Sequence, residues 1–213
     1  MTFGFELRLK ADSKQAVFMR LFLALDIDAD IRNRISRFVE GVRNFAPDAR
    51  WVKAESLHVT LKFIGEFPDD RVAALQQELM GVSAPTTEIH FRGYGFFPTP
   101  KSARVFWVGM EAGPQLAGLA AAIDEKMPTL GIAKEERAFS PHLTLARSSG
   151  GSGSPRWRKG DGPSNTFQLL QGKLAALPAP EFGTMTPREF FLYQSQLSPK
   201  ESKYTKLAKF PLS

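Results

Sequence analysis

Cysteine is absent from this sequence of 213 residues, and histidine occurs only three times. The absence of cysteine excludes disulfides and thiolate metal sites, so the fold requires no oxidising compartment. No apolar run reaches the roughly 18 residues that a membrane-spanning helix needs, and the first residues lack the apolar region of a secretory signal. These absences predict a cytoplasmic protein that is not attached to a membrane.

Several well-known catalytic patterns are also missing. The sequence has no H-E-x-x-H pair for zinc, no G-x-S-x-G nucleophile turn and no G-x-x-x-x-G-K-[ST] phosphate loop. We therefore expect neither a metal nor a cofactor. His90 lies outside any repeated pattern, and we interpret it as a structural or exposed histidine.

What the sequence does contain is a net charge of +6, an isoelectric point near 9.6 and a repeated histidine pattern. The basic balance is compatible with a partner that carries phosphate, although many basic proteins bind no nucleic acid. The pattern H-x-T-L occurs twice, at residues 58–61 and 142–145, and accounts for two of the three histidines. Its repetition makes these two stretches the candidate functional site.

Each copy of the pattern lies in an apolar run, at residues 57–64 and 139–146, and such runs are typical of buried strands. Residues two apart on a strand share a face. His58 and Thr60 should therefore point to one side of the first strand, and His142 and Thr144 to one side of the second. We infer that two lobes bring the two pairs together.

Two imidazoles in one site can supply an acid and a base, because the unperturbed pKa of histidine is about 6.5. Hydrolysis of a phosphodiester needs a base to activate water and an acid to protonate the leaving oxygen. Thr60 and Thr144 could donate hydrogen bonds to phosphate oxygens. Arg147 could add an anion contact, but strict alternation places it on the face opposite His142. It reaches the site only if the strand ends or bulges near Ala146.

The rest of the chain alternates between strand and helix patterns. Further strands are expected at 19–27, 88–94, 104–110 and 189–196, with a strand or extended tail at 204–212. Helical spacing predicts helices over 31–42, 72–80, 114–127 and 167–177. The proline-rich residues 96–100 are expected to form a loop. This order favours an α+β fold with two strand-rich lobes.

Two stretches stand apart from this pattern. Residues 1–18 show no clean periodicity and are assigned as an N-terminal extension of unknown role, leaving 19–213 as a single bilobal domain. Residues 148–155 are rich in glycine and serine and should be flexible. The basic residues 156–159 follow, and an RNA contact there is worth testing.

From residue 19 onward the chain resembles the two-histidine (2H) phosphoesterases, and specifically the LigT-like RNA 2′,3′-cyclic phosphodiesterases, also called 2′-5′ RNA ligases. The paired H-x-T-x motifs carry the resemblance together with their flanking sequences. The matching stretches are MRLFLAL at 19–25, RWVKAESLHVTLKFIGE at 50–66, GYGFFPTPKSARVFWVG at 93–109, FSPHLTLAR at 139–147 and FFLYQSQLSPKESKYTKLAKFPL at 190–212.

This resemblance implies two antiparallel-sheet lobes related by a pseudo-twofold axis, with helices outside and a central cleft. It also implies metal-independent opening of an RNA 2′,3′-cyclic phosphate to a 2′-phosphomonoester. His58 would be the general acid that protonates the leaving 3′-oxygen, and His142 the general base that activates water. Thr60, Thr144 and Arg147 would bind the phosphate. The expected partners are RNA with 2′,3′-cyclic ends or small cyclic nucleotides, acted on by a monomer.

Two alternatives remain open from the sequence. The same two histidines would serve 2′-5′ ligation or cleavage of 2′-5′ linkages, which are related reactions of one site. A second alternative is a non-enzymatic RNA-binding module in which the His-Thr pairs only hold phosphate. That module would bind RNA in a salt-dependent manner without turnover.

Overall fold

The computed structural model describes residues 17–148, 165–197 and 202–213. The strands are β1 (Phe18–Asp26), β2 (Arg50–Trp51), β3 (His58–Pro68), β4 (Ile89–Phe97), β5 (Val105–Ala112), β6 (Leu143–Arg147), β7 (Glu181–Met185), β8 (Glu189–Leu197) and β9 (Ser202–Pro211). The α-helices are α1 (Ala29–Val42), α2 (Val72–Met80), α3 (Pro114–Lys126) and α4 (Gln168–Ala175).

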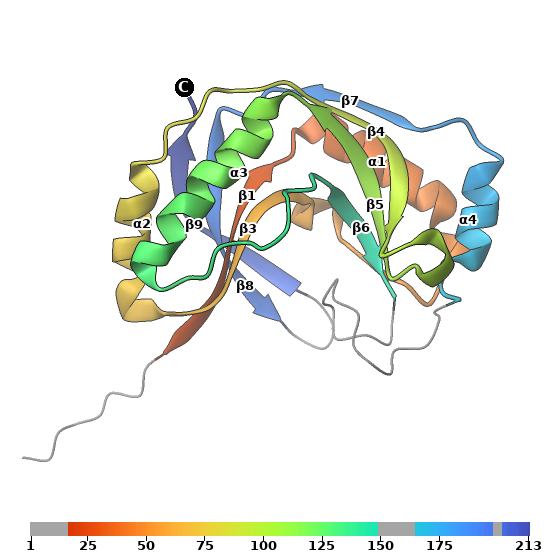
Figure 1. Cartoon of the computed structure of the whole chain (residues 1–213). Helices are drawn as coiled ribbons and strands as arrows, with labels where there is room; N and C mark the ends of the chain where they lie inside the picture. The colour runs from red at the N-terminus through yellow and green to blue at the C-terminus, as the bar shows by residue number, and fades with distance from the viewer. Residues whose placement is uncertain (1–16, 149–164, 198–201) are drawn as a thin grey trace, which may run out of the picture.

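The strands form two antiparallel sheets. The first sheet has the order β3-β1-β8-β9, and the second has the order β2-β6-β5-β4-β7. Each sheet contains one strand from an H-x-T-L motif: β3 in the first sheet carries the whole first motif, and β6 in the second sheet carries the second motif except its histidine. Figure 1 shows the helices on the outer sides of the two sheets. The expected α+β fold with two antiparallel-sheet lobes is confirmed.

Two helices link the two sheets. Helix α1 follows β1 of the first sheet, precedes β2 of the second and packs against β7 of the second. Helix α3 connects β5 and β6 of the second sheet, yet it packs against β3 of the first, as Figure 1 shows. The two sheets therefore share one continuous hydrophobic core.

The apolar spacing of these helices explains their packing. Ile31 and Ile35 of α1 are buried, as are Leu119 and Ile123 of α3, because residues three to four apart share one helix face. Pro114 occupies the first turn of α3, where its missing N–H costs no hydrogen bond. The predicted helices all form, with α4 somewhat shorter than expected.

Several predicted details were wrong. Helix α2 buries Leu75 and Leu79, whereas Met80, its last residue, is 77% exposed. Strand β4 continues through Phe97, so the predicted loop at 96–100 starts only at Pro98. Strand β6 starts at Leu143 instead of residue 139, which leaves His142 just outside it. Strand β7 was not predicted at all.

At the N-terminus, β1 begins at Phe18, and the carbonyl of Val17 accepts a hydrogen bond from the Asp69 amide. Residues 1–16 lie outside the described residues, as do 149–164, which include most of the Gly/Ser-rich stretch and the basic residues 156–159.

Both motifs contain a β-bulge at the same position, their final leucine. In β3, Thr60 pairs with Ala24 and Lys62 with Leu23, so Leu61 has no partner residue on β1. The register of β6 against β5 likewise skips Leu145. A bulge of one residue reverses the alternation of side chains beyond it. Two consecutive buried residues therefore follow the threonine of each motif, and only the residue after them lies on the same face as the histidine.

Candidate active site

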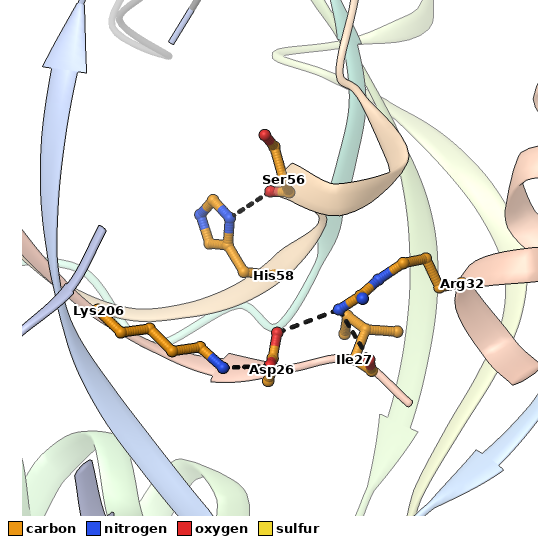
Figure 2. A network of polar contacts seen from close by, with 6 residues as sticks. All are labelled: Asp26, Ile27, Arg32, Ser56, His58 and Lys206. Carbon is orange, nitrogen blue, oxygen red and sulfur yellow. Dashed lines mark hydrogen bonds and ion pairs between the residues drawn. The ribbon is translucent and has the colours of Figure 1, made fainter. Parts of the chain in front are cut away.

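His58 lies at the start of β3, and a backbone carbonyl fixes the orientation of its side chain. Its Nδ1 lies 2.8 Å from the carbonyl oxygen of Ser56, as Figure 2 shows. The side chain is half-buried, and its ring centroid lies 4.8 Å from that of Phe22 and 5.2 Å from that of Tyr204. The imidazole is thereby fixed in orientation by one hydrogen bond and by aromatic packing.

His142 repeats this arrangement in the second sheet's motif. Its Nδ1 lies 2.9 Å from the carbonyl oxygen of Ser140, again two residues earlier in the chain. Phe97 packs edge-on against the imidazole at 5.0 Å between ring centroids, and Phe97 in turn stacks on Trp107 at 4.9 Å. The two histidines thus share one backbone geometry but have different aromatic neighbours.

The Nδ1 contacts determine which nitrogen of each ring is available for chemistry. A carbonyl oxygen only accepts hydrogen bonds, so Nδ1 must carry the proton and donate it to Ser56 or Ser140. In the neutral imidazole, Nε2 is then the basic nitrogen. Each histidine is therefore set up to take or give a proton at Nε2.

Arg147 reaches the same site because of the bulge in β6. Without the bulge at Leu145, alternation would have placed its side chain on the face opposite Thr144. Its positive charge acts on both imidazoles and lowers the pKa of each. The condition stated from the sequence, a bulge near Ala146, is met by the structure.

Strands β3 and β6 are neighbours across the two sheets, and this brings the two motifs together. The charge of His142 also acts on His58. Thr60 and Thr144 are half-buried, each two residues after its histidine. The five residues proposed from the sequence thus belong to one place in the fold.

The pKa values of both histidines are lower than usual in the substrate-free protein. Burial is the main cause and lowers the pKa of His58 from 6.5 to about 4, with further lowering by Arg147. Burial also lowers the pKa of His142. The hydrogen bonds to Ser56 and Ser140 act in the opposite direction. Both imidazoles are therefore neutral near pH 7 before substrate binds.

A carboxylate distinguishes the surroundings of the two histidines. Asp26 pairs with His58 across β1 and β3, and its negative charge raises the pKa of His58. Figure 2 shows Asp26 held by Arg32 at 3.2 Å and by Lys206 at 2.6 Å. Among the described residues, no carboxylate acts on His142 in this way. The symmetry of the two motifs is therefore broken by Asp26.

The low pKa of His58 predicts acid-sensitive stability. Between pH 6.5 and about 4 the unfolded chain binds a proton at His58 that the folded protein does not bind. The free energy of unfolding should therefore fall as the pH is lowered through this range, by less than about 1.4 kcal/mol per pH unit from this one group.

Urea unfolding of the wild type and of His58→Gln at a series of pH values measures this dependence. The variant should show a shallower slope. Equal slopes for the wild type and His58→Gln would contradict the prediction.

The described residues contain no group of three or more His, Cys, Asp or Glu side chains that could hold a metal ion. Within the same part of the chain, no helix is long and apolar enough to span a membrane. His90, which lies outside the motifs, contacts Glu88 and Thr184 with its side chain 50% exposed. Of the two interpretations given from the sequence, structural or exposed, the structure shows the exposed one.

Comparison with known proteins places the chain in a family. The family model described as "LigT like Phosphoesterase" matches residues 25–107. An RNA 2′,3′-cyclic phosphodiesterase of Archaeoglobus fulgidus is 32% identical over 192 residues, which cover 90% of this chain and 99% of the relative. The chain belongs to the LigT-like phosphoesterase family.

Other LigT-like phosphoesterases agree with this assignment. The RNA 2′,3′-cyclic phosphodiesterase of Escherichia coli is 28% identical over 197 residues, covering 91% of this chain and 97% of the relative. A crystal structure of E. coli LigT complexed with 3′-AMP superposes with a TM-score of 0.71 at 26% identity, covering 92% of this chain and 99% of that chain. The resemblance noted in the sequence is confirmed.

The sequence interpretation missed several parts of this LigT-like site. Ser56 and Ser140 are important through their carbonyl oxygens, and the signal was present, because both motifs read S-x-H-x-T-L. Phe97 and Trp107 lie beside His142, and their positions in the sequence did not indicate this contact. No sequence signal identified Asp26, whose role depends on strand pairing.

Proposed function

We propose that this protein is an RNA 2′,3′-cyclic phosphodiesterase that hydrolyses 2′,3′-cyclic phosphate ends to 2′-phosphomonoesters. One observation carries the proposal: the imidazoles of the two motifs have the same Nδ1 hydrogen bond to a backbone carbonyl, and one arginine acts on both. Relatives named for this activity match about nine tenths of the chain. No metal is required, and the cysteine-free sequence suits the cytoplasm.

In the proposed reaction, His142 is the base. Its Nε2 takes a proton from water, and the water oxygen attacks phosphorus while the bond from phosphorus to the 3′-oxygen breaks. His58 gives its Nε2 proton to that leaving oxygen. Thr60, Thr144 and Arg147 stabilise the charge on the remaining phosphate oxygens. The product carries a 2′-phosphate and a free 3′-hydroxyl.

The acid must acquire its proton when substrate binds, because His58 is neutral near pH 7 in the free protein. A phosphate anion beside the ring offsets the positive charge of Arg147 and favours the imidazolium form. Asp26 acts in the same direction on His58. This asymmetry supports His58 as the acid and His142 as the base.

The direct test uses an oligoribonucleotide with a 2′,3′-cyclic phosphate end, incubated with the protein in the presence of a metal chelator. We expect complete conversion to the 2′-phosphomonoester, identified by ³¹P NMR and by comparison with synthetic 2′- and 3′-phosphate standards. A 3′-phosphate product would overturn the assigned direction of ring opening. Salt-dependent binding without turnover would instead indicate an RNA-binding module.

A further inference from the structure

A buried lysine lies directly behind the first motif. Lys62 of β3 is 3% exposed, although lysine is almost never fully buried unless its charge is paired. Its Nζ lies 2.7 Å from Asp124 Oδ1, 3.2 Å from Glu135 Oε1 and 2.9 Å from the carbonyl oxygen of Ala133. The three donors of the ammonium group thus have three acceptors.

The bulge at Leu61 sends Lys62 to this place. Strict alternation from His58 and Thr60 would turn Lys62 toward the site as a candidate phosphate contact. The register shift instead turns it to the opposite side of β3, where α3 packs and carries Asp124. Lys62 therefore belongs to the packing between the two halves of the molecule and not to the phosphate site.

The partners of Lys62 lie on the segment that leads to the second motif. Between α3 and β6 the chain forms no regular helix or strand over residues 132–142. Ala133 and Glu135 are fixed near its beginning, and Asp124 also accepts hydrogen bonds from the Glu135 amide at 3.1 and 3.2 Å. The same segment contains Ser140, whose carbonyl orients His142 at its end.

We propose that Lys62 is a positioning residue that ties the segment 133–135 to β3 and so sets the placement of His142 relative to His58. This contact connects β3, which carries His58, to the segment that leads to His142. Because proton transfer requires close placement of both groups, a small displacement of His142 lowers the rate of the chemical step. The catalytic part of this inference rests on the proposed function.

The first test variant is Lys62→Met, which keeps the length of the side chain and removes its charge. It leaves the carboxylate of Asp124 without its ion-pair partner and should destabilise the protein. A second variant, Lys62→Met with Asp124→Asn, removes both charges and should recover much of the lost stability while leaving the tie broken. Leu174→Ala is the control: Leu174 is a core residue of α4, remote from this segment in the chain, and its truncation lowers stability by a different route.

The expected result is a kcat lowered about 10- to 100-fold in both Lys62 variants, per folded protein, with KM changed less than about threefold. Amide hydrogen exchange in residues 133–141 should be at least about tenfold faster than in the wild type. Leu174→Ala should keep the wild-type kcat and the wild-type exchange in this segment. A double variant with restored stability and normal kcat would overturn the catalytic role of the tie.

Amide hydrogen exchange distinguishes a failure of this inference from a failure of the proposed function. Should the wild type itself fail to open cyclic phosphates, the proposed function is wrong, and the exchange rates alone decide whether Lys62 positions the segment. Unchanged exchange in residues 133–141 of the double variant would overturn the inference in either case.

Discussion

Replacing either motif histidine with alanine is expected to lower kcat on a 2′,3′-cyclic phosphate substrate by about 10²- to 10⁴-fold, the usual contribution of a positioned general acid or base. The physical reason is that each ring offers Nε2 for proton transfer while Nδ1 is committed to a backbone carbonyl. His58→Ala and His142→Ala should both retain substrate affinity within about tenfold, because Thr60, Thr144 and Arg147 remain. Single-turnover kinetics with the cyclic-ended oligonucleotide measure the chemical step directly.

The double variant sharpens this expectation. Since the acid and the base act in one step, the variant that lacks both histidines should have a kcat only slightly lower than that of either single variant. His90→Ala is the matched control, because His90 is half-exposed and lies outside the motifs. A folded His58→Ala or His142→Ala protein with full activity would exclude the two-histidine mechanism. Losses in kcat that simply multiply in the double variant would indicate that the two rings contribute independently to the transition state and not as one unit.

Arg147→Gln is expected to lower kcat/KM by about 10²- to 10³-fold, the typical cost of losing one preorganised donor to a developing oxyanion. The bulge at Leu145 brings this guanidinium to the side of Thr144, and its charge acts on both histidines. Arg147→Lys should recover only part of the loss, because a lysine ammonium cannot make the planar bidentate contact of a guanidinium. Steady-state kinetics of the two variants test this order.

A matched arginine substitution controls for net charge. Arg92 on β4 is about half-exposed and pairs with Glu111 and Glu181, so Arg92→Gln changes the charge without touching the site. It should leave kcat/KM within about twofold. If Arg147→Gln and Arg92→Gln behave alike, Arg147 contributes only to the general electrostatic attraction of RNA and not to the phosphate site.

Much of the site could be predicted from the sequence because the motif is short, repeated and located on strands. The alternation of buried and half-buried residues in β3, with Val59 buried between His58 and Thr60, follows directly from the two-residue period. The helices were also predictable, since their apolar spacing is regular over two to four turns. The same reasoning placed Thr144 correctly on β6, but it also placed His142 on that strand, which begins only at Leu143.

The bulges could not be predicted in this way. Leu61 and Leu145 are ordinary strand residues, and only the register against β1 and β5 shows that each lacks a partner. That register depends on contacts far apart in the sequence, which local spacing does not contain. The sequence alone therefore could not show on which face of the strand Lys62 and Arg147 lie. In the structure, Lys62 is buried away from the site and Arg147 lies at the site. Asp26 likewise becomes important only through its pairing with His58.

The placement of helices α1 and α3 has a consequence for how the molecule unfolds. Helix α3 joins two strands of the second sheet and covers the first, and helix α1 continues from a strand of the first sheet and covers the second, so the apolar surface of each sheet is shielded by a helix connected to the other. Opening one lobe therefore exposes apolar surface in both, and the free energy of that opening approaches that of global unfolding. A partly unfolded state with one intact lobe is therefore not much lower in free energy than the fully unfolded chain. The surroundings of the two histidines should be lost together and not one at a time.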